Sequence, residues 1–410
     1  MAGSSYRRRG AVRATPALPA EHASAITPIR TQSRRVLLET TTTSQPSLPE
    51  KYQNQEQIFG SAFQVLKEAI AAHAFPGASI AVTHAGNLVA LQAFGHFTYE
   101  QKNSPRVTRD TVFDLASVSK VVATTTMALL LYERGMLALD APVIGVLPEV
   151  RGSDHRRAEI TFRHLLAHSS GLPAYEKLFL QAHNRDELMQ QAFVVQLQHD
   201  PGTHVEYSDV GFILLGVALE RLAQEPLDRF CQREIFGPLG MAHTGFNPSP
   251  ARKTQIPPTA NDQTFRKRII QGEVNDENAS VMGGVAGHAG VFSTASDIAI
   301  FANAMLQGGA QILRPQTLEL FTRREKSPPG TSRALGWDTP SSPSQSGKYF
   351  SAHSFGHLGY TGTSLWIDPL PQVSIILLTN RTWPDCSNKA IIEIRPKFHD
   401  SVMEALGVAV

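Results

Sequence analysis

The chain is poor in cysteine and contains no long hydrophobic run. Its 410 residues include only 2 cysteines, Cys231 and Cys386, which are far apart in the sequence. Two distant cysteines provide neither a disulfide framework nor a zinc site. The best candidate apolar runs, MALLLY and VSIILL, are much shorter than the roughly 18 residues that cross a membrane. These shortages argue against a disulfide-stapled scaffold and against a membrane span.

Charge is also sparse and nearly balanced. Charged residues make up 18% of the chain and hydrophobic residues 42%, and the formal net charge is +2. No long basic stretch follows the N-terminal tail, which argues against a dedicated nucleic-acid-binding protein. The motif G-x-S-x-G is absent too, which argues against an α/β-hydrolase fold. What is present is the composition of a globular protein with one or two domains.

The N-terminal part differs from the rest of the chain. It is rich in Arg, Ser, Thr and Pro and lacks the apolar core, roughly 7–15 residues long, of a secretory signal. We interpret residues 1–52 as a disordered extension or a misassigned start, with a targeting segment as the alternative. The missing signal core predicts a cytoplasmic protein, whereas a wrongly assigned start would allow a periplasmic or secreted one.

Elements of the same kind occur near both ends of the globular part. Residues 58–75 have apolar side chains at helical spacing, and residues 77–97 predict two strands around a turn. Residues 362–381 predict a second hairpin, and residues 388–406 predict a closing helix that Pro396 should interrupt. We therefore expect an α+β fold, with an antiparallel sheet flanked by helices.

This pattern divides the globular part into two domains. Residues 53–130 and 281–410 are expected to build the sheet domain, in which Thr294 begins a helix with a pattern like a capping box. The region 131–280 is expected to form a mostly helical domain. Within it, Thr161 is placed to cap a short helix, and residues 208–224 predict a longer one with an apolar face.

A serine and a lysine stand three residues apart at a predicted helix start. In FDLASVSKVVAT, Ser117 and Lys120 share one helix face, whereas Ser119 points elsewhere. A hydroxyl becomes a good nucleophile when a neighbouring base takes its proton, and a desolvated lysine can do this. The helix N-terminus adds a field that favours developing negative charge. By itself the pair also fits polar residues at an ordinary helix start, which is the more common case.

A tyrosine precedes the longer helix in PGTHVEYSDVGFILLG. Tyr207 could bear a phenolate or pass a proton to a leaving group. The alternative is structural, with Tyr207 as a wedge between elements and Asp209 as the N-cap of the helix. The motif alone favours this structural interpretation.

Glycines surround a histidine and a tyrosine in FGHLGYTGTSLWIDP. Because glycine lets the backbone approach a ligand closely, His357, Gly359 and Tyr360 could border a binding site. A strand edge there could offer backbone N–H groups to an oxyanion. The alternative is a glycine-rich bulge at the start of a strand.

Together, these motifs resemble those of the serine β-lactamase and penicillin-binding-protein superfamily. The chain is similar in kind to class C β-lactamase-related serine hydrolases, including family VIII carboxylesterases. The resemblance covers about residues 55–405, and it is carried by FDLASVSKVVAT, HLLAHSSGLP, PGTHVEYSD, GEVNDENA, GGVAGHAGVFSTASD and GHLGYTGTSLWIDP. It implies a β-lactamase/transpeptidase-like fold and serine chemistry.

The resemblance also implies a role for each motif residue. Ser117 would be the acylated nucleophile, Lys120 its proton-handling partner, and Tyr207 the group that activates water or protonates the leaving group. Which of Lys120 and Tyr207 is the base is disputed in such enzymes. The backbone N–H groups of Ser117 and Tyr360 would form the oxyanion hole, and His357 begins the triplet that replaces Lys-Thr-Gly.

Two residues depart from the β-lactamase pattern and bear on the substrate. Position 209 is Asp rather than Asn, and a carboxylate cannot donate to an acylamide carbonyl. Close to Lys120, Asp209 would favour the charged ammonium and weaken the lysine as a base. His357 replaces a lysine, so a fixed positive charge that could hold a substrate carboxylate is lost. Both changes favour small esters over penicillins and cephalosporins.

Other polar clusters have weaker claims to chemistry. His164 and His168 stand four residues apart on one short helix, but no third metal ligand is evident. The acidic cluster at 273–277 fits a loop near the cleft mouth better than a glycosidase carboxylate pair. Residues 283–290 lack the Gly-Lys-Ser/Thr ending of a phosphate loop and predict a flexible cleft wall. We expect neither a metal nor a cofactor.

The sequence therefore predicts a serine hydrolase that works through an acyl-enzyme on Ser117. A carboxylesterase acting on small esters is the favoured activity, and a small ester or amide is the expected partner. The alternatives are a peptidoglycan-fragment amidase or D,D-peptidase, a β-lactamase, and a non-catalytic sensor of the penicillin-binding type. GEVNDENA and GGVAGHAG support the cell-wall alternative, because relatives with this pattern are associated with cell-wall fragment recycling.

Overall fold

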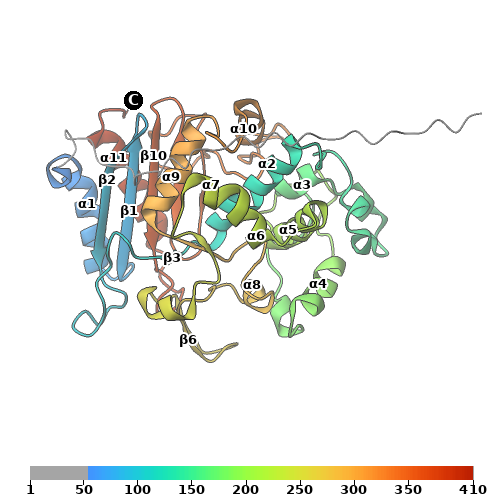
Figure 1. Ribbon diagram of the computed structural model, residues 1–410, viewed down its shortest axis with the longest axis horizontal. Helices are drawn as coiled ribbons and strands as arrows, with labels where there is room; N and C mark the ends of the chain where they lie inside the picture. The colour runs from blue at the N-terminus through green and yellow to red at the C-terminus, as the bar shows by residue number, and fades with distance from the viewer. Residues whose placement is uncertain (1–53, 410) are drawn as a thin grey trace, which may run out of the picture. The chain divides into compact units, whose positions relative to one another are not determined.

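The computed structural model describes residues 54–409, so the expectation for residues 1–52 lies outside the described residues. Its main element is a five-stranded antiparallel sheet with the strand order β2-β1-β10-β9-β8 (Figure 1). Both predicted hairpins are present, and the pairing of β1 with β10 joins them into one sheet. These strands are β1 Gly77–His84, β2 Asn87–Gly95, β8 Phe355–Leu358, β9 Ser364–Asp368 and β10 Val373–Thr379.

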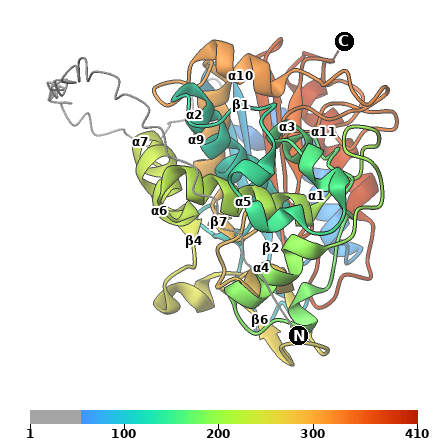
Figure 2. The ribbon, with the colours of Figure 1, turned by 90° about the vertical axis from the view of Figure 1, so that its right-hand side faces the viewer.

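Helices cover both faces of the sheet (Figures 1 and 2). On β10, Ile375 belongs to an apolar cluster that includes α1 (Gln55–Ala71) and α11 (Ile391–Ala405). Its neighbour Ile376 belongs to a second cluster, which includes α9 (Ala295–Leu306). Because side chains alternate along a strand, a strand with apolar residues at every position fits between two apolar layers.

Helix α11 continues through Pro396, so the predicted interruption at this residue is wrong. Proline has no N–H to donate to the carbonyl oxygen of Ile392, four residues earlier. That oxygen instead accepts a hydrogen bond of 3.0 Å from the side-chain amide of Gln345. A side chain from a loop outside the helix thus replaces the missing bond.

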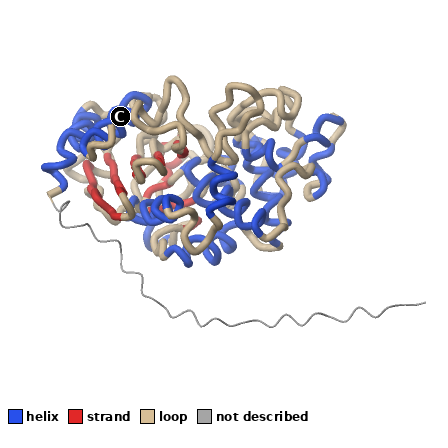
Figure 3. The backbone as a smooth tube through the Cα atoms, turned by 90° about the horizontal axis from the view of Figure 1, so that it is seen from above, coloured by secondary structure: helices blue, strands red, loops and turns tan. Residues whose placement is uncertain are grey.

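The strands lie between helices at one end, and a part made mainly of helices and loops lies beside them (Figure 3). No helix within residues 54–409 is long and apolar enough to cross a membrane. The further α-helices are α2 Thr126–Glu133, α3 Phe162–Leu166, α4 Arg185–Val194, α5 Asp209–Ala223, α6 Leu227–Cys231, α7 Gly237–Leu239, α8 Glu277–Val281 and α10 Pro315–Thr322. The short strands are β3 Phe113–Asp114, β4 Gly245–Phe246, β5 Ala260–Asp262, β6 Arg268–Ile270 and β7 Val291–Ser293.

Side-chain caps define the starts of several helices. Thr161 caps α3 and Thr294 caps α9, as predicted. At α5 the cap is Ser208, whose hydroxyl accepts a hydrogen bond of 3.0 Å from the N–H of Gly211. The interpretation of Asp209 as the N-cap is therefore wrong, because it is the first helical residue. Its carboxylate is available for another contact.

The sheet and the helical part share one core. A single apolar cluster extends from Ala81 in β1 and Ile376 in β10, through α9 and α2, to Phe212 in α5. The same cluster includes Phe355 in the edge strand β8. Because this core is continuous, α2, α5 and β8 have fixed positions relative to one another. The three motifs singled out in the sequence meet where these elements adjoin.

Candidate active site

Ser117 follows a strained turn at the end of β3. Ala116 adopts a φ of +47°, a left-handed conformation that costs a residue with a side chain about 1–2 kcal/mol. Its N–H donates to Oδ1 of Asp114 at 2.8 Å, and Oδ2 of the same side chain accepts from the N–H of Asn275 at 2.7 Å. Burial raises the pKa of Asp114 to about 6. Asp114 therefore joins this turn to the loop before α8.

Ser117 and Lys120 lie side by side. Residues 116–118 form a turn of 3-10 helix, and Lys120 begins the π-helical segment Lys120–Thr125 that follows it. Oγ of Ser117 is 3.0 Å from Nζ of Lys120. Ser119 points away, and its Oγ accepts a hydrogen bond of 3.0 Å from the N–H of Val291. The structure thus distinguishes the two serines in the way that their spacing predicts.

Lys120 is buried and has an acceptor for each of its three N–H groups. Its Nζ lies 2.6 Å from Oδ1 of Asp209, 2.9 Å from the carbonyl oxygen of His288 and 3.0 Å from Oγ of Ser117. Burial by itself lowers the pKa of Lys120, but Asp209 and Tyr207 outweigh burial, and the net shift is upward. Lys120 is therefore a charged ammonium at neutral pH.

Tyr207 packs against the same ammonium. The centroid of its ring is 5.0 Å from Nζ of Lys120, and its hydroxyl interacts with both Ser117 and Lys120. Burial raises the pKa of Tyr207, and the positive charge of Lys120 offsets part of this rise. The imidazole ring of His168 packs at a tilt of 37° against the ring of Tyr207, with 4.6 Å between the centroids. The phenol is thus held between the ammonium of Lys120 and the imidazole of His168.

The two histidines considered as a metal pair have separate roles in backbone structure. Nδ1 of His168 accepts the N–H of Ser208 at 3.0 Å, beside Tyr207. Nδ1 of His164 accepts the N–H of Thr161 and completes the capping box of α3. Among residues 54–409, no three His, Cys, Asp or Glu side chains are grouped so that they could hold a metal ion. His168 fixes the segment that presents Tyr207.

The turn after β8 brings the third motif to the same place. His357 is buried, and its ring centroid lies 5.9 Å from that of Tyr207. Burial, together with the positive charges of Lys120 and Arg333, holds the pKa of His357 well below its usual value. The imidazole is therefore neutral. Position 357 carries no positive charge in this protein.

Two threonine side chains bind this turn to the nucleophile segment. Oγ1 of Thr361 donates to the carbonyl oxygen of Asp114 at 2.9 Å. Oγ1 of Thr363 donates to the carbonyl oxygen of Leu115 at 2.8 Å. Gly359 packs so closely here that a Cβ would lie 1.9 Å from Oγ1 of Thr363. These contacts fix the turn after β8 against the backbone segment that precedes Ser117.

The segment 283–290 forms part of the cavity wall, as its glycines predict. His288 and Ala289 line the cavity, while Gly287 lies against α5. A Cβ on Gly287 would be 2.1 Å from the carbonyl oxygen of Phe212, so only glycine fits this contact.

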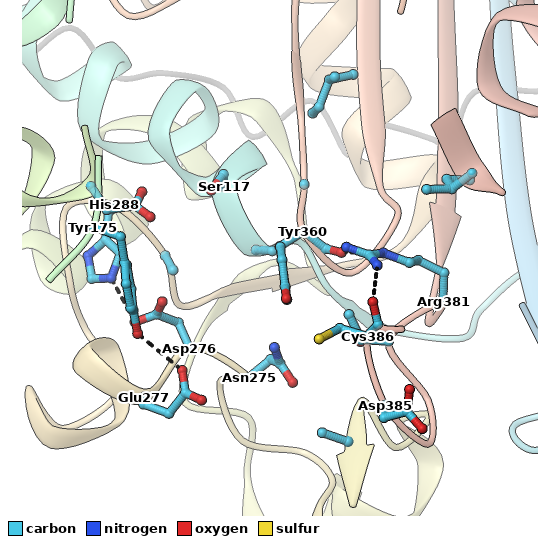
Figure 4. Close-up of a pocket in the computed structure, with 18 of the residues that line it drawn as sticks. Ser117, Tyr175, Asn275, Asp276, Glu277, His288, Tyr360, Arg381, Asp385 and Cys386 are labelled. Atoms are coloured by element: carbon cyan, nitrogen blue, oxygen red, sulfur yellow. Dashed lines mark hydrogen bonds and ion pairs between the residues drawn. The ribbon is translucent and has the colours of Figure 1, made fainter. Parts of the chain in front are cut away.

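These residues border a cavity of about 1080 Å³, which is at the upper end of the usual range for ligand pockets. Figure 4 shows Ser117 and Tyr360 at the cavity, with Asp276 and Glu277 on one side and Arg381 on the other. The ring of Tyr360 is half-exposed. Nε of Arg381 donates to the carbonyl oxygen of Tyr360 at 2.8 Å.

Sequence reasoning missed two features of this site. Oδ1 of Asp276 lies 2.8 Å from Nε2 of His288, whose carbonyl oxygen accepts from Lys120. The guanidinium carbon of Arg333 lies 5.4 Å from the centroid of the Tyr207 ring. The acidic cluster at 273–277 is the sequence feature that could have indicated Asp276 as a residue of the site. No local pattern marks Arg333, because it lies in a loop between α10 and β8.

Comparisons with known proteins agree with this fold. A family model described as Beta-lactamase matches residues 62–394. The chain is 32% identical to an N-acetylmuramyl-L-alanine amidase of Bacillus subtilis (strain 168), over 78% of this chain and 80% of that protein. It is also 32% identical to a putative D-alanyl-D-alanine carboxypeptidase of Escherichia coli (strain K12), over 67% of this chain and 70% of that protein.

Among solved structures, EstCE1, a hydrolase with promiscuous acyltransferase activity, has a TM-score of 0.68 at 23% identity. This likeness covers 84% of the present chain and 100% of EstCE1, and it shows the fold. The class is thus a serine hydrolase with the β-lactamase/transpeptidase fold. The chain belongs to the β-lactamase family, which confirms the family and the fold predicted from the sequence. The names of the relatives include an amidase and a carboxypeptidase, so membership does not select the substrate.

Proposed function

We propose that this serine hydrolase cleaves an amide bond in a peptidoglycan fragment through an acyl-enzyme on Ser117. The observation that carries the proposal is the 3.0 Å contact between Oγ of Ser117 and Nζ of Lys120 beside a cavity of about 1080 Å³. A cavity of this size suits an amino sugar with a short peptide, whereas a short ester fills a small part of it. The two relatives that are 32% identical are named for bonds to alanine, which supports the same substrate class.

In the proposed first step, Oγ of Ser117 attacks the carbonyl carbon of the amide. Its proton passes to the phenol oxygen of Tyr207 rather than to Lys120, because the three N–H groups of Lys120 already have acceptors. Tyr207 is a neutral phenol, so its own hydroxyl proton passes at the same time to the amide nitrogen. The ammonium of Lys120 stabilises the negative charge that develops on the phenol oxygen during this relay. The backbone N–H groups of Ser117 and Tyr360 hold the oxyanion.

In the following steps, the C–N bond breaks to release the amine. Water then attacks the acyl-enzyme, and one of its protons passes to the phenol oxygen of Tyr207 while the hydroxyl proton of Tyr207 passes to Oγ of Ser117. The ester bond to Ser117 breaks as the acid leaves. One water molecule is consumed for each amide bond cleaved.

A carboxylesterase acting on small esters is the second candidate. Two observations favour it: the imidazole of His357 is neutral, and Asp209 is engaged by Lys120 and cannot donate to an acylamide carbonyl. The site therefore lacks a positive charge at position 357 and an amide donor at position 209. In the family that the sequence resembles, β-lactam recognition uses both groups. Esters place fewer demands on leaving-group protonation, so the same machinery would hydrolyse them.

The test compares the protein with its Ser117→Ala and Ser119→Ala variants on four substrates. These are a muropeptide mixture, a peptide ending in D-Ala-D-Ala, p-nitrophenyl butyrate and a chromogenic cephalosporin. Ser119 provides the matched control, because its hydroxyl faces the backbone of Val291. We expect amide cleavage by the protein and by Ser119→Ala, and none by Ser117→Ala.

Fast ester hydrolysis without amide cleavage would replace the proposal with the carboxylesterase. Turnover of the cephalosporin alone would indicate a β-lactamase. Failure on every substrate, with no labelling of Ser117 by a serine-directed phosphonate, would indicate a non-catalytic sensor.

A further inference from the structure

Two tyrosine rings line the cavity without being buried. Tyr175 is 36% exposed and Tyr360 is 50% exposed, although both residues border the cavity. Figure 4 shows them on opposite sides of the space beside Ser117. Aromatic rings contribute large contact surfaces when they become buried, so two open rings at one cavity offer such a surface to a ligand.

The two rings are held in place by their neighbours. The carbonyl oxygen of Ala174 accepts the N–H of the first residue of α5 at 2.8 Å, which fixes the segment of Tyr175. The hydroxyl of Tyr175 donates to Oε2 of Glu277 at 3.3 Å. The guanidinium carbon of Arg381 lies 4.7 Å from the ring centroid of Tyr360. Rings that are already fixed lose little conformational entropy when a ligand binds.

Polar groups accompany the two rings. The backbone of Asn275 is held on both sides, because its N–H donates to Asp114 and its carbonyl oxygen accepts from Arg266. Among the described residues, the buried amide oxygen of its side chain has no hydrogen-bond partner. Glu277 lines the cavity as well. An amide both donates and accepts hydrogen bonds, and a carboxylate accepts them through two oxygens.

The charges around the cavity are nearly balanced. Among the described residues, its lining includes five Lys or Arg and six Asp or Glu, and one of the six, Asp209, is paired with Lys120. The balance gives no strong preference for a charged ligand. Arg381 already lies against the ring of Tyr360, so a second cation there would be repelled. The rings and their polar neighbours therefore favour an uncharged polar ligand.

A pyranose sugar has the matching chemistry. Its C–H groups pack on the negative face of an aromatic ring, and its hydroxyl groups can donate to a carboxylate or exchange hydrogen bonds with an amide. We propose that Tyr175 and Tyr360 hold a sugar ring of the substrate beside Ser117. Asn275 and Glu277 bind the polar substituents of this ring, and the assignment rests on the proposed function.

The place of the sugar determines which bond is cleaved. The scissile carbonyl group lies at Oγ of Ser117, so a sugar between the two tyrosine rings is attached close to that group. The cleaved amide is then the one that joins an acid substituent of the sugar to the first amino acid of the peptide. A scissile bond several residues along the peptide would place the sugar outside this space.

The experiment measures binding to the Ser117→Ala protein, which keeps the cavity and cannot form an acyl-enzyme. Titration calorimetry compares muramyl dipeptide with lactoyl-L-alanyl-D-isoglutamine, which is the same acid and peptide without the sugar. A third ligand is muramyl dipeptide without its N-acetyl group, which carries an ammonium on the sugar.

The variants Tyr175→Leu, Tyr175→Phe and Tyr360→Leu are each combined with Ser117→Ala. Leu180→Ala is the matched control, because Leu180 is 64% exposed and stands five residues from Tyr175 but does not line the cavity. Thermal unfolding verifies that each variant is folded. The comparison of ligands in the Ser117→Ala protein alone decides the question if a tyrosine variant does not fold.

We expect the Ser117→Ala protein to bind muramyl dipeptide roughly tenfold more tightly than the ligand without the sugar. Tyr175→Leu and Tyr360→Leu should each remove most of this difference, by weakening the binding of muramyl dipeptide alone. Tyr175→Phe keeps the ring and should keep most of the difference. Leu180→Ala should keep all of it.

Equal affinity for the ligands with and without the sugar would overturn the proposal. Equal losses for both ligands in the tyrosine variants would also overturn it. Tighter binding of the ammonium form would replace the sugar site with a cation site. If the sugar is bound but the unmutated protein cleaves no amide of muramyl dipeptide, the proposed function fails and the sugar site stands. If that protein cleaves both amides equally well, the sugar site fails and the proposed function stands.

Discussion

At the scale of single residues, the ion pair between Lys120 and Asp209 sets the charge of Lys120. Asp209 raises the pKa of Lys120, whereas burial lowers it. Asp209→Asn removes the negative charge that raises the pKa of Lys120 but keeps the burial that lowers it, so this pKa should fall. If Lys120 acts as a cation, the alkaline limb of the pH profile of kcat/KM should move to lower pH. The measurement is kcat/KM for p-nitrophenyl butyrate across the pH range.

The same variant tests the competing assignment. If neutral Lys120 is the base, a lower pKa makes more of it available, and the acid limb of the profile moves to lower pH instead. Asp209→Glu keeps the negative charge and serves as the control. Asp209 also raises the pKa of Tyr207, so an acid limb set by a tyrosinate would move in the same direction. An acid limb that is retained in Tyr207→Phe and still moves with Asp209→Asn would contradict the assignment of Tyr207 as the proton acceptor.

At the scale of elements, the turn after β8 is positioned by Thr363. Its hydroxyl donates to the carbonyl oxygen of Leu115 at 2.8 Å and so ties the turn of Tyr360 to the segment before Ser117. Thr363→Val keeps the shape and removes this bond. We expect kcat to fall by roughly tenfold to a hundredfold with KM nearly unchanged, because a small displacement of the oxyanion donors is costly.

Thr363→Ser is the matched control for this turn. It retains the hydroxyl and should restore most of kcat. A loss of equal size in both variants would mean that the methyl group matters, and the positioning role would be lost.

Helix α11 offers a prediction about stability. Pro396 lies inside this helix, where proline typically costs about 3 kcal/mol, and Gln345 recovers part of this by binding the carbonyl oxygen of Ile392. Pro396→Ala should therefore raise the free energy of unfolding by about 1–2 kcal/mol, measured by urea denaturation. Lower stability would mean that the proline ring packs better than its replacement.

At the scale of the whole molecule, the sheet is stabilised by an apolar layer on each face. Ile375 is fully buried in the layer with α1 and α11, away from the cavity. Ile375→Ala should lower the free energy of unfolding by about 2–5 kcal/mol and leave kcat of the folded protein unchanged. Leu370 in the same hairpin is 66% exposed, so Leu370→Ala should change stability by less than about 0.5 kcal/mol.

The elements of this fold were largely predictable because their signals are local. The hairpins of the sheet follow from apolar strands on either side of a short turn, and Thr161 and Thr294 cap helices as their sequence contexts indicate. Two local rules failed. Pro396 does not end α11, because Gln345 compensates for it from outside the helix. Asp209 does not cap α5, because Ser208 does so one residue earlier.

The candidate site was predictable only in part. Ser117 and Lys120 are three residues apart, so one turn of helix is enough to bring them together. Asp209 reaches Lys120 from 89 residues away, and only the packing of α5 against the helical segment Lys120–Thr125 fixes that distance. Arg333 has no motif, no periodic context and no neighbour in the sequence that reveals its place.

By itself, the sequence determined the proximity of Ser117 and Lys120, the antiparallel sheet and membership of the β-lactamase family, because each depends on short-range patterns or on motifs in a fixed order. Only the tertiary structure decided the charges in the cavity. Lys120 is a cation because Asp209 is 2.6 Å away, His357 is neutral because it is buried beside two cations, and Arg333 stands over Tyr207. Charge states depend on burial and on distances between remote segments, and those quantities exist only after the chain has folded.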